Sequence, residues 1–256
     1  MLILGYIDDS ADQSKSIAAV AGAFLGDEAQ WKRLATAWRE RLAAEGVPYY
    51  RSTSLKSWRG PFFCYQDRAH YSVEQAREAE RTLRADLQSI IRVSGVIGFA
   101  HYIPLEMYNR VRATVPMAAE VFPKDAFYPV MQSLIRDCAK TFREHYGDKH
   151  QLAFVCDEGP SSHLIFEVYK NFKYHNTDFS NLVGPLSFGD DKITPQLQAA
   201  DMMAAIGRDI AIQHLKVGAT SHDGPLNPSI YFVRHWDEKN MLDILAYQLQ
   251  TMKERQ

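Results

Sequence analysis

Residues 1–9 read MLILGYIDD, and residues 151–157 read QLAFVCD. Each segment is a short apolar run that ends on aspartate, a pattern that predicts a buried strand. Residues 16–25 form another apolar run, rich in small side chains, so residues 1–25 predict a β-hairpin that opens the domain. Ligand sites in α/β sheets gather outside the carboxyl ends of the strands. Asp8 and Asp157 are therefore the first candidates for a functional site.

The rest of the chain predicts how these strands are arranged. Two further apolar runs predict strands at 96–103 and 182–188, and apolar residues at helical spacing predict helices over 27–45, 72–92, 124–146, 161–172, 194–216 and 237–255. Strands joined by hairpin-like or inserted links pair antiparallel, whereas strands alternating with helices pair parallel. The order predicts an α/β fold: a ribonuclease-H-like mixed five-stranded sheet with helices on both faces.

This fold would occupy the whole chain as one domain, 1–256. Residues 27–92 would form a helical insertion between the second and third strands, and 237–255 a C-terminal helix. Residues 47–63 and 217–229 are rich in glycine and proline and predict loops.

Composition limits the classes of partner. The 256 residues carry a formal net charge of −2, and no apolar run approaches the roughly 20 residues that span a bilayer, so no membrane partner is expected. The three widely spaced cysteines form no metal-type pair or disulfide framework, which favours a cytoplasmic location. Proteins that bind nucleic acid non-specifically usually carry a large excess of positive charge, so any nucleic-acid contact here must depend on a local patch of basic residues.

Asp201 stands out on the helix that begins at Thr194-Pro195. It lies four residues after Leu197 and three before Ala204, so all three share one face of the helix. A carboxylate on an apolar face is costly unless it is paired or binds a metal. A structural hydrogen bond is the alternative for Asp201, and a cap at the end of a strand is the alternative for Asp8 and Asp157.

Clustered carboxylates at these positions would suit a divalent-metal site. Mg²⁺ and Mn²⁺ prefer oxygen ligands, and many nucleases use two such ions about 3.5–4 Å apart. The predicted catalytic and ligating residues are Asp8, Asp157 and Asp201. Further ligands would come from Asp9, Glu158 and Asp191, with Asp190 as an alternative in the same loop.

Two stretches are candidates for contact with substrate. Lys192 follows the acidic loop and would meet a phosphate there, unless the loop is simply a solvated charged turn. Residues 31–60 hold seven basic and two acidic side chains with five aromatic residues between them, which suits a single-stranded nucleic-acid surface. Arg51 and Lys56 are the predicted contacts, although Trp31 and Trp38 also fit the spacing of a core.

The motifs together resemble a known family. Residues 6–10 read YIDDS, 154–159 read FVCDEG, 188–192 read FGDDK and 195–201 read PQLQAAD. In this order they resemble the bacterial and phage family called domain of unknown function 3800, from Tyr6 to about Ala205. The resemblance implies a ribonuclease-H-like fold and a metal-dependent nuclease, without a settled substrate.

The sequence departs from that family at two motifs. Family members usually begin with an Asp-Glu-Ser-Gly-like motif, where this chain has Asp8-Asp9-Ser10-Ala11. Many have a Phe-His-Met-Thr-like stretch, which here is YRST at 50–53, so the histidine is absent. The glutamate on the first main helix of ribonuclease H has no clear counterpart, and Glu144 and Asp137 are the candidates.

Three functions remain open on the sequence. The first is a Mg²⁺- or Mn²⁺-dependent nuclease, with DNA or RNA undecided. The second is a non-catalytic binding module on the same fold, in a mobile-element or phage-defence system, which the missing histidine and the low positive charge favour. The third is a hydrolase of a smaller phosphate ester, which needs no basic surface. The oligomeric state is not predicted.

Overall fold

A mixed sheet forms the centre of the molecule. The computed structural model describes residues 2–11, 17–175, 178–217 and 231–254. Within them the strands follow the order β5-β4-β1-β2-β3-β6. Their bounds are β1 Leu2–Ala11, β2 Ala18–Gly26, β3 Ile97–Pro104, β4 Gln151–Asp157, β5 Val183–Gly189 and β6 Tyr231–His235. Strands β1, β2 and β3 pair antiparallel, β4 is parallel to both β1 and β5, and β6 is parallel to β3.

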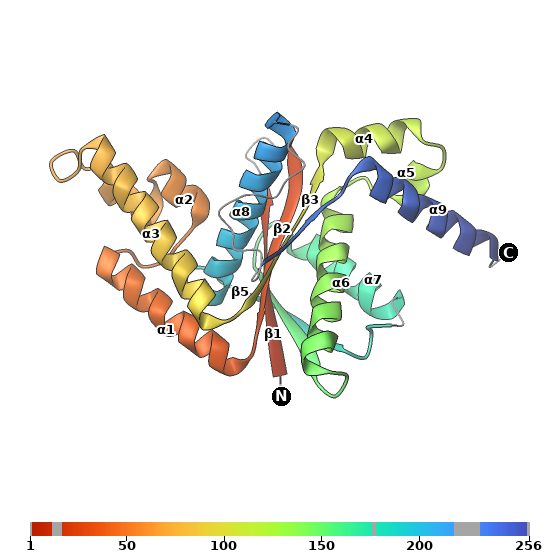
Figure 1. The fold of residues 1–256 in the computed structure, drawn as a ribbon, viewed down its shortest axis with the longest axis horizontal. Coiled ribbons are helices and arrows are strands. Elements are labelled where there is room, and N and C mark those ends of the chain that lie inside the picture. Colours follow the sequence, from red (N-terminus) through yellow and green to blue (C-terminus); the bar gives the residue numbers. More distant parts are fainter. Residues whose placement is uncertain (1, 12–16, 176–177, 218–230, 255–256) are drawn as a thin grey trace.

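The helices cover both faces of this sheet. Their bounds are α1 Glu28–Glu45, α2 Ser52–Ser57, the 3₁₀ helix η1 Gly60–Gln66, α3 Val73–Ser94, α4 Leu105–Thr114, α5 Ala118–Val121, α6 Phe127–Tyr146, α7 Ser162–His175, α8 Pro195–Val217 and α9 Glu238–Glu254. Helix α8 packs on β1, β2 and β3, whereas α6 packs on β2 and β3 from the other side (Figure 1). The predicted ribonuclease-H-like fold is confirmed by the order and direction of its five strands, and β6 extends the sheet beyond β3.

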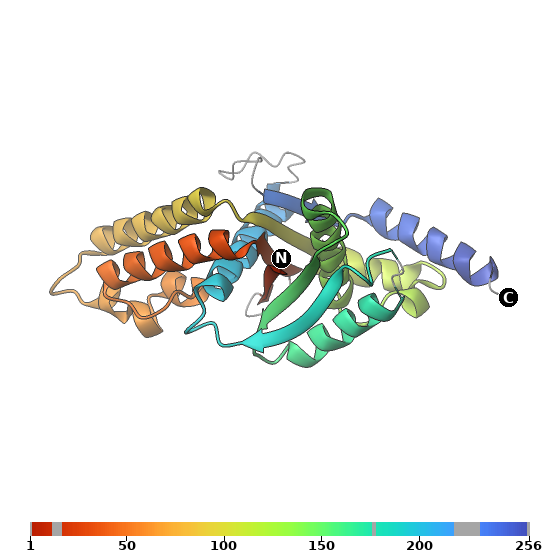
Figure 2. The ribbon, with the colours of Figure 1, turned by 90° about the horizontal axis from the view of Figure 1, so that it is seen from below.

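The segment between β2 and β3 is mostly helical and lies on the α8 side of the sheet. Helices α1 and α3 run side by side, away from α7 and α9 (Figure 2). Both begin with a capping box, in which Asp27 pairs with Gln30 and Ser72 with Gln75. Their apolar faces pack with α2, η1 and α8 in one continuous core. A second core fills the opposite face of the sheet, between the strands and α6 and α7.

Glycine at position 22 lets α8 lie directly on the sheet. Gly22 of β2 is the strand partner of Asp8, and a Cβ built on it would lie 2.3 Å from the backbone nitrogen of Ala204. That distance is far below any van der Waals contact, so only glycine allows this approach of helix to strand. The backbone of α8 is therefore held close to the part of the sheet that carries Asp8.

The structure differs from the sequence-based expectation in three segments. The predicted loop at 47–63 contains α2 and most of η1, which are too short to show helical periodicity. Residues 105–121 form α4 and α5, and residues 231–235 form β6, none of which the apolar pattern predicted. The predicted loop at 217–229 lies outside the described residues except for Val217.

Candidate functional site

The register of the two central parallel strands sets the directions of Asp8 and Asp157. Tyr6 pairs with Val155, and both pack in the core on the α1–α8 side of the sheet. Side chains alternate between the faces of a strand, so residues two positions further on face the same side. Asp8 and Asp157 are these residues, and both therefore face α8.

Asp201 reaches this region from α8 and is held by a second element. It lies one turn before Ala204, where α8 contacts β2, and its Oδ2 accepts a 2.6 Å hydrogen bond from the Ser52 backbone N–H. Ser52 is the first residue of α2, whose own N-cap, Arg51, gives no side-chain cap. Asp201 thus caps α2, so the structural alternative considered from the sequence is realised in part.

Asp191 joins the group from the loop after β5. Its backbone N–H donates to Asp157 Oδ1 at 3.3 Å, and its own buried carboxylate lies 4.0 Å from Arg51 Nε. The structure thus gathers Asp8, Asp157, Asp191 and Asp201, referred to below as the carboxylate cluster. Three strand ends and one helix supply the four side chains.

These carboxylates disfavour one another's ionisation. Burial raises the pKa of Asp8 well above its ordinary value, and the negative charges of Asp201, Asp9 and Asp157 raise it further. Burial and then the charge of Asp191 raise the pKa of Asp157 to about 6. The negative charge of the ionised carboxylates is therefore not balanced by positive charge around them.

One guanidinium opposes this charge. Arg51 lowers the pKa values of Asp157, Asp191 and Asp201, yet burial keeps all three above the ordinary range. Its side chain is 49% exposed, so Arg51 is also open to solvent. Arg51 is half-exposed, and the exposed Lys192 lowers the pKa of Asp191 alone, so the two cations do not neutralise four carboxylates and the cluster remains a site of negative potential.

The oxygen ligands of the cluster are of the kind that a hard divalent cation prefers, but their positions in the structure do not yet form a site for one. Carboxylate oxygens are the ligands that Mg²⁺ and Mn²⁺ prefer. Among the described residues, however, no three His, Cys, Asp or Glu side chains converge closely enough to hold one ion together. Binding would therefore require side chains of the cluster to turn toward a common point.

The other predicted ligands lie at different distances from this group. The charge of Asp9 acts on Asp8, and Asp9 Oδ2 accepts from Ser161 Oγ at 3.4 Å. Glu158 is exposed, and within the described residues no hydrogen bond or ion pair of its side chain is found. Asp190 is exposed as well and accepts from the backbone N–H of Lys192.

The predicted substrate contacts are only partly placed at the cluster. Arg51 adjoins Asp191, and the exposed Lys192 lowers the pKa of the same carboxyl group. Lys56 instead pairs with Asp209, at 3.6 Å. The aromatic residues of the basic stretch do not form a stacking surface, because Trp31, Trp38, Tyr50 and Trp58 are buried in the core.

Gln198 is a positioning residue that the sequence analysis missed. Its buried Oε1 accepts from Trp38 Nε1 at 2.8 Å and from the Tyr50 backbone N–H at 3.0 Å. Its Nε2 donates to the Asp191 carbonyl at 2.7 Å. One amide thus ties α1, the segment before α2 and the acidic loop to α8, and the only sequence signal was a polar residue one helical turn from Asp201 on a buried helix.

Neither candidate for the ribonuclease H glutamate reaches the cluster. Asp137 of α6 pairs with Arg234 and His101 on the opposite face of the sheet. Glu144 is exposed and lies 4.0 Å from Lys140. The cluster therefore has no carboxylate from α6.

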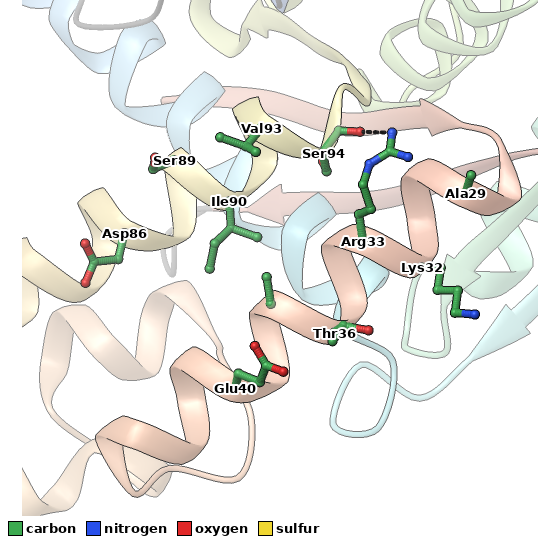
Figure 3. A pocket seen from close by; sticks show the side chains of 11 residues that line it. Ala29, Lys32, Arg33, Thr36, Glu40, Asp86, Ser89, Ile90, Val93 and Ser94 are labelled. Carbon is green, nitrogen blue, oxygen red and sulfur yellow. Dashed lines mark hydrogen bonds between the residues drawn. The ribbon is translucent and has the colours of Figure 1, made fainter.

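A separate groove lies between α1 and α3, away from the cluster. It has a volume of about 800 Å³ and is lined by Lys32, Arg33 and Glu40 of α1 and by Ile90 and Val93 of α3, the two helices that Figure 3 shows side by side. Arg33 closes one end by donating to the Ser94 carbonyl at 2.9 Å. None of the carboxylates of the cluster lines this groove.

Comparisons with known proteins give a distant structural likeness. No family model and no curated protein match the sequence. A chain in the solved structure of the PCNA:RNase HII complex from Archaeoglobus fulgidus is similar over 97% of this chain and 89% of that one, with 13% identity and a TM-score of 0.39. This likeness is too weak to assign a function, and the fold assignment stands on the strand order. No described helix combines the length and the apolar composition needed to cross a bilayer.

Proposed function

We propose that the protein is a divalent-metal-dependent nuclease, with Mg²⁺ or Mn²⁺ held by Asp8, Asp157 and Asp201. The proposal rests on one observation: Asp8 is buried among like charges that raise its pKa, and within the described residues its own carboxylate forms no ion pair with a cation. A buried carboxylate without a counter-charge is costly. A bound divalent cation supplies that charge, and carboxylates are its preferred ligands.

When bound, the ion would activate water and stabilise charge on the leaving oxygen of a phosphodiester. The protein's own residues position the groups around it. Ser52 and Gln198 hold Asp201 and the acidic loop in place. Arg51 is half-exposed beside Asp191, where its guanidinium is placed to contact a phosphate. Asp9, Glu158 and Asp191 complete the proposed set of ligands.

We further propose that the chain belongs to the family called domain of unknown function 3800. The proposal is supported by the match of its motifs to the carboxylate cluster: YIDDS contains Asp8, FVCDEG contains Asp157, FGDDK contains Asp191 and PQLQAAD contains Asp201. Residues that are distant in the sequence but form one cluster are the residues that a shared chemistry would retain.

A non-catalytic binding module is the second candidate. It is favoured by the absence of three converging ligands among the described residues and by Arg51 at the position of the family's histidine. In that case the cluster would be a relic of a catalytic centre, and the fold would serve recognition.

The deciding experiment measures metal binding and cleavage on the same variants. Calorimetric titration with Mn²⁺ should detect binding by the wild type and none by Asp157→Asn, whereas Asp148→Asn, an exposed carboxylate in the turn after α6, should bind as the wild type does. Labelled DNA and RNA, single- and double-stranded, should then be cleaved only by the two metal-binding proteins. Mn²⁺ binding without cleavage of any of them would favour the binding module.

A further inference from the structure

Three cations surround a single carboxylate about two turns along α8 from Asp201. Lys56 Nζ of α2 lies 3.6 Å from Asp209, Arg84 of α3 lies 4.0 Å from it, and Arg208 lies 3.9 Å from it. Charge-assisted hydrogen bonds measure about 2.7–2.9 Å, so none of these contacts is one. All three cations lie near Asp209, but none of them forms a hydrogen bond with its carboxylate.

The charge around Asp209 is positive on balance. A second carboxylate paired with these cations is Glu80, which lies 3.4 Å from Arg84 and 2.7 Å from Arg77. Counting Arg77, four cations face two carboxylates, which leaves an excess of two positive charges. A chain with a formal net charge of −2 thus carries a local basic site close to its carboxylate cluster.

Arg208 is the most buried of the three cations. The residue is only 9% exposed, and within the described residues its guanidinium has no hydrogen bond and one ion pair, the 3.9 Å contact with Asp209. The guanidinium nitrogen atoms of Arg208 still reach solvent, so an anion can approach them. Arg208 lines a small hollow together with Lys56 and Arg84. Its free volume of about 10 Å³ suits one oxygen atom of an anion rather than a whole phosphate group.

The hollow adjoins the carboxylate cluster through α2. Ser52 Oγ donates to the Tyr50 hydroxyl at 3.0 Å, and both residues line the hollow. The backbone N–H of the same Ser52 donates to Asp201. With a rise of 1.5 Å per residue, Arg208 lies about 10 Å along α8 from Asp201.

We propose that Lys56, Arg84 and Arg208 bind a backbone phosphate of a nucleic-acid strand whose neighbouring segment lies at the carboxylate cluster. The link between the two sites rests on the proposed nuclease function. A distance of about 10 Å corresponds to about three nucleotides of a strand, at 3.4 Å each along a duplex axis. A small phosphate ester cannot span it, so the substrate is a polynucleotide.

Metal-free binding of an oligonucleotide tests the site apart from catalysis. Fluorescence anisotropy would follow a labelled single-stranded DNA in EDTA, across a range of salt concentrations. Arg84→Gln and Lys56→Gln should each weaken binding several-fold and make the salt slope about 0.7 less negative. Asp209→Asn should tighten binding, because it removes the carboxylate that competes with phosphate. Thermal unfolding would verify that each variant is folded.

The matched control is Arg81→Gln on the same helix. Arg81 is 69% exposed and pairs with Glu78, so its loss changes the net charge equally without touching Asp209. Equal binding by Arg84→Gln and Arg81→Gln would overturn the proposal, as would weaker binding by Asp209→Asn. Inorganic phosphate that competes as strongly as the oligonucleotide would identify a free-anion site and also overturn it.

The two proposals fail separately. Mn²⁺ titration of Arg84→Gln should match the wild type, and Asp157→Asn should retain metal-free oligonucleotide binding. If the wild type binds no Mn²⁺ but Arg84→Gln still weakens oligonucleotide binding, the nuclease proposal is wrong and the phosphate site stands. If the wild type binds Mn²⁺ but Arg84→Gln binds the oligonucleotide as Arg81→Gln does, the phosphate site alone is wrong.

Discussion

Two polar clusters lie on opposite faces of the same sheet and differ in their balance of charge. On the α6 face, His101 Nδ1 lies 2.7 Å from Ser133 Oγ, and its Nε2 lies 3.3 Å from Asp137. Asp137 also accepts a 2.7 Å hydrogen bond from Arg234. On the α8 face, the half-exposed Arg51 acts on three of the four carboxylates, namely Asp157, Asp191 and Asp201.

The pKa values follow this difference. Burial alone would raise the pKa of Asp137, but the contacts with His101 and Arg234 lower it below its ordinary value. Burial and neighbouring carboxylates act in the same direction on Asp8 and raise its pKa. A charge-balanced cluster stabilises the fold, whereas an unbalanced one is costly unless a ligand completes it. Ser133, His101 and Asp137 include the residue types of a hydrolytic triad, but His101 and Ser133 are buried and Asp137 is occupied by Arg234.

The largest expected difference between the clusters is in activity. Asp8→Asn and Asp157→Asn should each reduce metal-dependent cleavage by more than about 100-fold, because even residues that only support a metal ligand cost about 10–100-fold. Asp137→Asn should retain activity within a few-fold, because its cluster lies on the other face. Cleavage rates at saturating Mn²⁺ would measure both. A comparable loss of activity in Asp137→Asn would show that the two clusters do not differ in their role in cleavage.

The second difference is in stability. Asp137→Ala leaves His101 and Arg234 without their anion, and breaking a buried charged pair costs about 3–5 kcal/mol. Arg234 is 56% exposed, so we expect a smaller loss of unfolding free energy, about 2–3 kcal/mol. Urea unfolding would measure it, with the exposed Asp148→Ala as the control. A loss below 0.5 kcal/mol, roughly the size of a surface substitution, would mean that the balanced cluster does not stabilise the fold.

The third difference concerns how α8 is placed. Gly22→Ala would force α8 away from β2, since its Cβ would meet the backbone of Ala204. Overpacking of this kind costs about 1–3 kcal/mol, and the displaced helix should weaken Mn²⁺ binding because Asp201 moves with it. Gly184→Ala is the control, as its nearest atom lies 3.4 Å away. Unchanged Mn²⁺ affinity in Gly22→Ala would show that the position of α8 is not critical.

The sequence predicts the sheet better than the surroundings of the site. Apolar runs that end on Asp8 and Asp157 mark strands directly, because burial on both faces demands continuous apolar residues. Asp201 was predictable because a carboxylate on an apolar helix face needs a partner. The short strand β6 and the roles of Ser52 and Gln198 were not, because they depend on contacts between residues that are 133 to 149 positions apart. The interleaved basic and aromatic residues do not mark a stacking surface, since all the aromatic ones except Tyr49 pack in the core.

The smallest expected effect is a gain in stability, whereas the substitutions above are expected to cause losses. Asp157→Asn should stabilise the metal-free protein at about pH 8, because it removes a charge that its neighbours repel. The folded-state pKa of Asp157, about 6, exceeds the ordinary value of 3.8, so the folded protein loses stability as pH rises between these values. Near pH 4 the carboxyl group is largely protonated in the folded state, and the gain should nearly vanish.

Thermal unfolding in EDTA at both pH values would measure this gain, with Asp148→Asn as the control for a general charge effect. Added Mn²⁺ should reverse the order, because a ligand that binds only the folded wild type raises its stability and leaves Asp157→Asn unchanged. A variant less stable than the wild type in EDTA at about pH 8 would mean that Asp157 is held by compensating contacts, as Asp137 is. The reversal of sign on adding metal is the result that distinguishes a site awaiting a cation from a balanced structural cluster.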